Sequence, residues 1–175
     1  RGAAEQLEAL YVSAEFFPEC AGREAIFNVT GDGGCAVLVD EAAHRNRIVA
    51  SAETTKGYYW DADALRNEIV ASYFPTAKHV IDETLRRARW SRDDVTWVIP
   101  HNVSVRSWDI LLGLVGIPRA RLWDRNVARV GHTLAGDNFI NLRDAIDDGS
   151  VCPGDRLLLF SYGYGAHWTA LAVEA

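Results

Sequence analysis

The residues best placed to do chemistry are two histidines that fall in loops, His101 and His132. An imidazole exchanges a proton near neutral pH, and it can donate a hydrogen bond to a developing oxyanion. His101 follows the apolar run 95–99 and Pro100, which cannot continue the hydrogen-bond ladder of a strand. The sequence therefore predicts His101 at the C-terminal end of a strand, where side chains face a crevice. A purely structural role is the alternative for either histidine.

The elements that would position these histidines follow from the spacing of apolar residues. Apolar residues recur at helical spacing in 105–115, after His101, and a second helix is expected at 139–146, after His132. A longer helical pattern covers 62–89, where Pro75 predicts a break or a bend. Strands are expected at 9–13, 35–39, 47–53, 95–99, 155–161 and 168–173, with 47–53 as the hairpin partner of 35–39 and the end of a helix before residue 9. This order predicts an α/β fold, a mixed sheet covered by helices.

Composition narrows the classes of function. The net charge is −6 and no lysine or arginine stripe is present, so nucleic acid is not an expected partner. No apolar run approaches the roughly 18–20 residues of a membrane span, and no signal peptide is visible. Cysteines at 20, 35 and 152 are widely spaced and odd in number, which favours reduced thiols in a cytoplasmic protein. Their spacing predicts no metal site, no cofactor is expected, and the glycines at 31–34 lack the lysine of a phosphate loop.

Several motifs in fixed order resemble one family. Segments 31–33, 79–85, 100–106, 131–136, 149–155 and 157–168 look like stretches of beta-ketoacyl-acyl-carrier-protein synthase III. This is a condensing enzyme of the thiolase fold, and the resemblance covers nearly the whole chain. It implies a thiolase-like fold in which this chain is mainly the C-terminal repeat. Residues 1–30 would be the tail of the N-terminal half, and residues 31–175 the C-terminal half with the catalytic histidine.

The resemblance also implies roles for individual residues. In this family a cysteine takes an acyl group from a thioester, and a histidine and an asparagine bind the carbonyl of a malonyl unit during decarboxylation. His101 matches the catalytic histidine. The turn Gly163-Tyr164-Gly165 matches the segment whose backbone N–H helps to form the acyl oxyanion hole. Arg106 matches a position associated with docking of the carrier protein, and a solvated helix residue is the alternative.

His132 is the first departure from the family pattern, because it stands where the family has asparagine. Two histidines could together bind an oxyanion, as in the chain-elongating enzymes of the same fold. Alternatively, the site could transfer an acyl group to an alcohol or amine, with His101 as general base. The sequence leaves both readings open, together with a structural role for His132.

The missing nucleophile is the second departure. The cysteines at 20, 35 and 152 fall in parts of the family pattern that are not catalytic, so we expect them to be inert. The catalytic cysteine would then belong to an N-terminal half, as a second polypeptide or as another part of the same one; the start at Arg1 without methionine favours a fragment or a processed chain. Acyl carrier protein or acyl-coenzyme A, and a homodimeric or heterodimeric partner, are the implied partners.

Two rival functions remain open at this point. One is a catalytically silent subunit that completes a dimer or docks a carrier protein. The other is a self-contained Cys-His hydrolase that uses Cys20 or Cys35. Bulky aromatic residues at 58–60 and Trp108 would shape a pocket for a large acyl group, which suits polyketide or other secondary-metabolite biosynthesis as well as fatty-acid synthesis.

Overall fold

A computed structural model describes residues 8–19, 22–25, 28–163 and 165–175. The strands are β1 (Glu8–Glu15), β2 (Glu24–Ala25), β3 (Asn28–Val29), β4 (Gly33–Asp40), β5 (Arg47–Thr55), β6 (Trp97–Ile99), β7 (Arg156–Gly163) and β8 (His167–Glu174). The helices are α1 (Arg66–Ala88), α2 (Val105–Val115), α3 (Arg125–Arg129) and α4 (Asp137–Asp147), and short 3-10 turns lie between them. The helix end expected before residue 9 falls mostly outside the described residues. The short pair β2 and β3 was not predicted.

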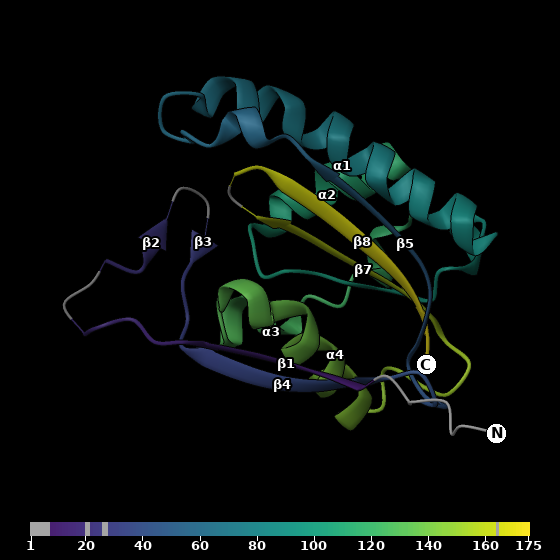
Figure 1. The fold of residues 1–175 in the computed structure, drawn as a ribbon. Coiled ribbons are helices and arrows are strands. Elements are labelled where there is room, and N and C mark those ends of the chain that lie inside the picture. The colour runs from purple at the N-terminus through teal and green to yellow at the C-terminus, as the bar shows by residue number, and fades with distance from the viewer. Residues whose placement is uncertain (1–7, 20–21, 26–27, 164) are drawn as a thin grey trace, which may run out of the picture.

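The main sheet has four strands in the order β5-β8-β7-β6 (Figure 1). β8 pairs antiparallel with both neighbours, and β6 pairs parallel with β7, so the sheet is mixed as predicted. The predicted hairpin between 35–39 and 47–53 is wrong. β4 pairs along its whole length with β1, from Glu8 opposite Asp40 to Glu15 opposite Gly33. β5 pairs with β8 instead. The residues between β4 and β5 carry the chain from one sheet to the other.

Helices cover both faces of the main sheet because its strands are apolar on both sides. Side chains of successive strand residues point to opposite faces. On β7, Leu158 and Phe160 join a core formed with α1 and α2, whereas Leu157 and Leu159 join a second core that includes Ala145 of α4. In Figure 1, α1 and α2 accordingly lie above the sheet, and α3 and α4 lie below it.

Pro75 was expected to give two helices or a bend; helix α1 runs through Pro75 as one element, so the first of these alternatives is wrong. A proline inside a helix loses one backbone hydrogen bond and costs about 3 kcal/mol. The apolar side of α1 is buried against the sheet, and each buried aliphatic side chain contributes about 1.5–3 kcal/mol. Several such side chains lie on both sides of the proline and hold the helix together: Ile69, Val80, Ile81 and Leu85.

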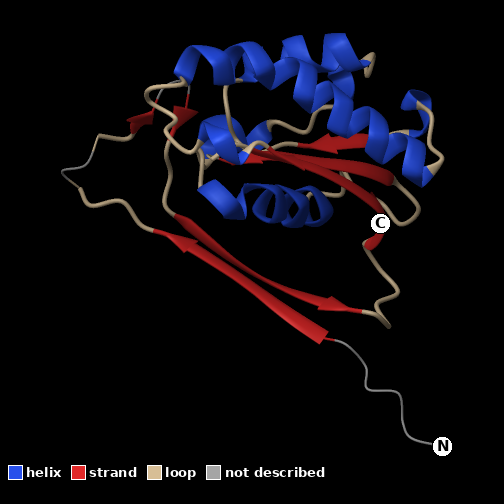
Figure 2. Cartoon of the chain, turned by 45° about the horizontal axis from the view of Figure 1, so that its top comes forward, coloured by secondary structure: helices blue, strands red, loops and turns tan. Residues whose placement is uncertain are grey.

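The strands β1 and β4 form a separate two-stranded ribbon, which we call the β1–β4 ribbon. Figure 2 shows it as a long hairpin-like pair beyond the layer of helices that includes α4. Its inner face meets the helical layer, where the Tyr11 ring lies 5.3 Å from that of Phe139 and the Tyr11 hydroxyl donates to the Ala135 carbonyl at 3.1 Å. The described layers are therefore helices, sheet, helices and ribbon, in that order.

Candidate active site

His101 lies where the sequence predicts it, between the end of β6 and the start of α2. Its side chain is buried, with 2% of the residue exposed. Nδ1 lies 3.2 Å from the Phe160 carbonyl oxygen on β7, and the Trp108 indole N–H donates to the His101 carbonyl at 3.1 Å. Because a carbonyl only accepts, Nδ1 carries the hydrogen and Nε2 keeps its lone pair.

Burial also sets the charge of His101. Desolvation lowers the pKa of this imidazole to about 4, and the nearby Asp137 carboxylate only partly opposes that shift. His101 is therefore neutral at physiological pH. A neutral ring in this tautomer can accept a proton at Nε2, but it has no Nε2–H to donate.

His132 reaches the same place from the loop between α3 and α4. Its backbone pairs with the segment before β4, since His132 N donates to Val29 O at 2.8 Å and Gly31 N donates to His132 O at 3.0 Å. A Cβ on Gly31 would lie 1.9 Å from the Val130 carbonyl oxygen, so only glycine permits this approach. The imidazole rings of His101 and His132 are 6.3 Å apart between centroids. Two loops distant in sequence thus bring the two predicted histidines together.

A buried carboxylate supports His132. Asp137 in the first turn of α4 is completely buried, and its Oδ2 lies 2.5 Å from His132 Nδ1. The same carboxylate accepts hydrogen bonds from Thr133 N at 2.6 Å, from Thr133 Oγ1 at 2.7 Å and from Asn102 N at 2.6 Å. Its place at the N-terminus of a helix also favours negative charge. Asp137 therefore fixes His132 with Nδ1 as donor and Nε2 facing away.

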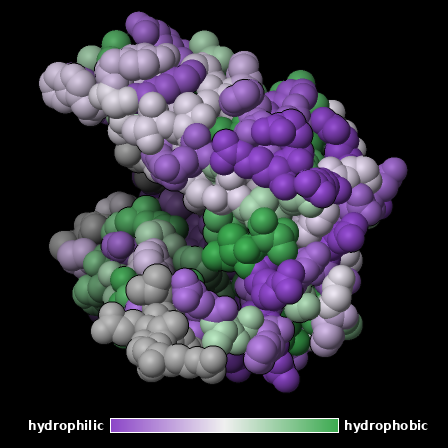
Figure 3. All heavy atoms as spheres, turned by 45° about the vertical axis from the view of Figure 1, so that its right-hand side comes forward, coloured by the Kyte–Doolittle hydropathy of each residue, from purple (hydrophilic) through white to green (hydrophobic). Residues whose placement is uncertain are grey.

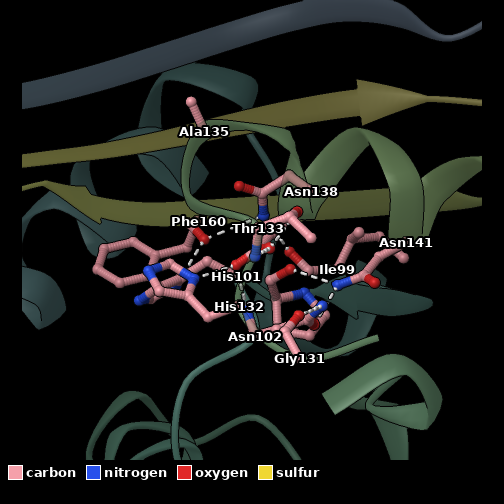
Figure 4. A network of polar contacts seen from close by, with 12 residues as sticks. Ile99, His101, Asn102, Gly131, His132, Thr133, Ala135, Asn138, Asn141 and Phe160 are labelled. Carbon is pink, nitrogen blue, oxygen red and sulfur yellow. Dashed lines mark hydrogen bonds and ion pairs between the residues drawn. The ribbon is translucent and has the colours of Figure 1, made fainter. Parts of the chain in front are cut away.

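Three asparagines join the two histidine loops to each other, to α4 and to β7 (Figure 4). Asn102 donates to the Gly131 carbonyl at 2.8 Å, and Asn141 donates to Asn102 Oδ1 at 2.7 Å and to the Pro100 carbonyl at 2.8 Å. Asn138 donates to Phe160 O, the carbonyl that also contacts His101. Asn102 and Asn141 are buried, and buried amides with several partners rigidify the loops that carry the imidazoles.

The sequence analysis missed Asp137 and these asparagines. One signal was present: Asp137, Asn138 and Asn141 are polar residues at positions i, i+1 and i+4 of a helix that follows a glycine. Such residues share one side of a helix, and polar residues on an inward side are held there by specific partners.

The other predicted site residues are Arg106 and the turn at 163–165. Arg106 is exposed in the first turn of α2. Gly163 ends β7 opposite His167, and Gly165 has φ of +105° in the turn that follows, while Tyr164 lies outside the described residues. The roles assigned to this turn and to Arg106 remain predictions.

The described cysteines are not in the histidine cluster. Cys35 is half-buried on β4, where burial raises the pKa of its thiol, and Cys152 is exposed in the turn before β7. Cys20 lies outside the described residues. Among the described residues, no group of three or more His, Cys, Asp or Glu side chains could hold a metal ion. No helix within the described ranges is long and apolar enough to cross a membrane.

Comparison with solved structures defines the class of protein first. The 3-oxoacyl-[acyl-carrier-protein] synthase III of Aquifex aeolicus VF5 matches over 96% of this chain and 58% of its own, with a TM-score of 0.78 and 24% identity. A structure described as ChlB3, an acyltransferase, matches over 99% of this chain and 60% of its own, with a TM-score of 0.88 and 20% identity. The fold is therefore thiolase-like, as predicted.

Sequence comparison defines the family. The family model for the C-terminal part of 3-oxoacyl-[acyl-carrier-protein (ACP)] synthase III matches residues 85–175. The chain belongs to this family, so the resemblance inferred from its motifs is confirmed. A beta-ketoacyl-[acyl-carrier-protein] synthase III of Vibrio vulnificus YJ016 is 31% identical over 66% of this chain and 32% of its own length. That of Aquifex aeolicus is 28% identical over 82% and 49%. The chain thus spans half or less of these curated relatives.

Proposed function

We propose that this chain is part of an acyl-thioester-dependent enzyme, a condensing enzyme or acyltransferase like beta-ketoacyl-acyl-carrier-protein synthase III. The observation that carries the proposal is the pair of imidazoles, His101 and His132, held 6.3 Å apart by loops that a buried polar network fixes. Membership of the synthase III family supports it. The pathway would be fatty-acid, polyketide or other secondary-metabolite biosynthesis in the cytoplasm.

The chemistry has two stages. A cysteine thiolate first takes the acyl group from acyl carrier protein or acyl-coenzyme A, and the acyl-enzyme then meets its acceptor. In a condensation the acceptor is a malonyl unit whose carbonyl needs hydrogen-bond donors, and in plain transfer it is an alcohol or amine that must lose a proton. His101 and His132 are the residues that would serve this second stage. The turn 163–165 would supply backbone N–H to the acyl oxyanion.

The cysteine would come from an N-terminal half, in this polypeptide or in another, and the β1–β4 ribbon supports this part of the proposal. Leu10 and Leu38 face each other on the outer side of the ribbon and are 68% and 62% exposed. Figure 3 shows hydrophobic side chains at the molecular surface beside a hollow. Large exposed apolar areas are typical of interfaces. Residues 1–30 would end the N-terminal half and residues 31–175 would form the C-terminal half, within a homodimer or heterodimer.

Carrier docking would use Arg106. Its guanidinium is exposed on α2, which starts four residues after the catalytic loop histidine. A phosphopantetheine-bearing carrier protein or coenzyme A presents anionic phosphate, which arginine binds with paired hydrogen bonds.

The test is intact mass spectrometry of the protein with both halves, before and after incubation with a panel of acyl thioesters. We expect one acyl mass on the cysteine-bearing half and steady turnover with a suitable acceptor. His101→Ala should lower turnover by about 10²–10⁴-fold, the usual contribution of a general acid or base. His79→Ala removes an exposed histidine of α1 and serves as the matched control. Absence of any acyl adduct, or an unchanged rate for His101→Ala, would favour the silent subunit instead.

A further inference from the structure

We infer that Asn138 is a positioning residue for His101, because its side-chain amide joins the end of β6 to β7 and shares the carbonyl that orients the imidazole. The inference rests on the proposed function and deepens it with a residue that acts on the reaction only through His101. It begins from Phe160 O, which lies 3.2 Å from His101 Nδ1 and 3.1 Å from Asn138 Nδ2 (Figure 4).

The Asn138 amide lies where the hydrogen-bond ladder between β6 and β7 stops. The two strands pair in parallel as far as Ile99, and Pro100 has no N–H with which to continue the ladder. Phe160 lies just past the last pair, and its carbonyl meets two side chains, the His101 ring and the Asn138 amide. Asn138 Nδ2 also donates to Ile99 O at 2.8 Å, so one amide binds the ends of both strands.

Hydrogen-bond chemistry fixes which way this amide faces. Both of its contacts, Ile99 O and Phe160 O, are carbonyl oxygens that only accept, so they face the NH2 group of Asn138 and not its oxygen. The NH2 group has two hydrogens, one for each carbonyl. An amide bound at two points cannot rotate without losing a bond, so it fixes the separation of the two carbonyls.

The two strands that Asn138 joins are held to different degrees. β7 pairs with β8 over its whole length, from Arg156 to Gly163, whereas β6 has three residues. The position of β7 and of the turn after it therefore depends on β8. The clamp by Asn138 acts mainly on the shorter strand and on the loop that carries His101.

The shared carbonyl sets Asn138 apart from the other side chains that hold this loop. Asn141 binds Pro100 O and Trp108 binds the His101 carbonyl, so both fix the backbone. Asn138 instead binds the acceptor of the imidazole itself. A carbonyl oxygen has two lone pairs, and with Asn138 on one of them the Nδ1–H of His101 is directed to the other. This sets the rotation of the ring and the direction in which Nε2 points.

The functional test uses the protein with both halves and reads the two stages separately. Intact mass after incubation with acetyl-coenzyme A measures acyl loading. Release of free coenzyme A measures turnover, with malonyl-coenzyme A or ethanolamine as acceptor, whichever the unmodified protein uses. Asn138→Leu removes both donors and keeps a side chain of similar size. We expect loading within about twofold, kcat lowered by about 10–100-fold as for a displaced catalytic group, and KM for the acceptor within about twofold.

A double-mutant cycle separates action through His101 from general loss of structure. His101→Ala removes the ring that Asn138 is inferred to position, so adding Asn138→Leu to it should change turnover by less than about twofold. An independent structural effect would lower turnover by the same factor in both backgrounds. The cycle therefore measures the coupling between the two side chains.

A measurement on the His101 ring needs no turnover. Its Nδ1–H is buried against Phe160 O, and NMR of nitrogen-labelled histidine reports how fast this hydrogen exchanges with water. Asn138→Leu should speed that exchange by about tenfold or more, because the ring gains freedom. Asn138→Ala, which removes the same donors with a smaller side chain, should do the same and replaces Asn138→Leu if leucine does not pack.

Asn67→Leu is the matched control. Asn67 is exposed and is the second residue of α1, just as Asn138 is the second residue of α4. The substitution is chemically identical but lies away from His101. Loading, turnover and hydrogen exchange should all stay within about twofold of the unmodified protein.

The outcomes separate this inference from the function on which it rests. Failure of the unmodified protein to take up any acyl group contradicts the proposed function. Unchanged exchange of the His101 Nδ1–H in both Asn138 variants overturns the inference, whether or not turnover is seen. So does normal loading with unchanged turnover in Asn138→Leu, or an equal loss in the presence and absence of the His101 ring.

Discussion

The strands of the main sheet and of the β1–β4 ribbon both carry apolar residues on both faces. They differ in what covers those faces. On β7, leucines at consecutive positions enter two different cores, one on each face of the sheet. On the ribbon, Tyr11 and Val37 face the helical layer, while their neighbours Leu10 and Leu38 face outward and are exposed. Strands that are apolar on both faces are typical of a sheet covered on both faces. The ribbon is therefore covered on one face only by the described chain.

The largest loss of stability is expected from a substitution in the main sheet, which is covered on both faces. Leu158 on β7 is fully buried in the core that contains α1. Leu158→Ala should lower the free energy of unfolding by about 2–5 kcal/mol, because it removes buried methyl groups and leaves a cavity. Denaturant titration of the protein measures this loss. A loss below about 1 kcal/mol would mean that β7 is not packed on that face.

The second prediction, of intermediate size, is a pH dependence of the free energy of unfolding. It arises from His101, which lies beside the covered main sheet. His101 has an ordinary pKa of 6.5 when exposed and about 4 when folded. Between these values the unfolded chain binds a proton that the folded protein does not, so stability falls as pH drops from about 6.5 to about 4. Roughly 3 kcal/mol should be lost across this window. Unfolding titrations at several pH values measure how the free energy of unfolding changes with pH. This slope reports the difference in bound protons between the unfolded and folded states, and His101→Asn should reduce that difference by about one.

The smallest expected effect tests the ribbon. Leu38 is exposed and loses few contacts within this chain on truncation. Leu38→Ala should therefore lower the free energy of unfolding by less than about 0.5 kcal/mol if nothing else covers the ribbon. If an N-terminal half covers the ribbon, the same substitution in the protein with both halves should cost about 1–3 kcal/mol. We expect the larger value by denaturant titration, with Leu158→Ala as the reference for a covered leucine. A cost within 0.5 kcal/mol of zero would contradict coverage by an N-terminal half.

Local patterns predicted the parts of the fold that depend on local physics. The strand that ends at Ile99, the loop with His101 and the helix from Val105 follow from a proline and two periodicities, and the structure has all three. The pairing of β5 failed because strand partners depend on contacts between distant residues. The division at Pro75 failed because burial of a long helix outweighs one lost hydrogen bond.

In the candidate site, too, the residues that lie in local motifs were predicted and those that depend on distant contacts were not. Motif order found His101 and His132, since each lies in a short recognisable segment. Asp137 was not found, because its burial and its hydrogen bonds to Asn102 and Thr133 depend on how separate segments pack together. A carboxylate in the first turn of a helix is common, and the polar spacing of 137, 138 and 141 does not by itself distinguish a buried Asp137 from a solvated one.

The close contact at Gly31 links assembly to chemistry. Val29 O and Gly31 N, just before β4, are both hydrogen-bonded to the His132 backbone, and the space at Gly31 admits no side chain. The position of His132 relative to the His101 loop is therefore tied to the segment that enters β4. A substitution that loosens the β1–β4 ribbon therefore also moves the His132 imidazole.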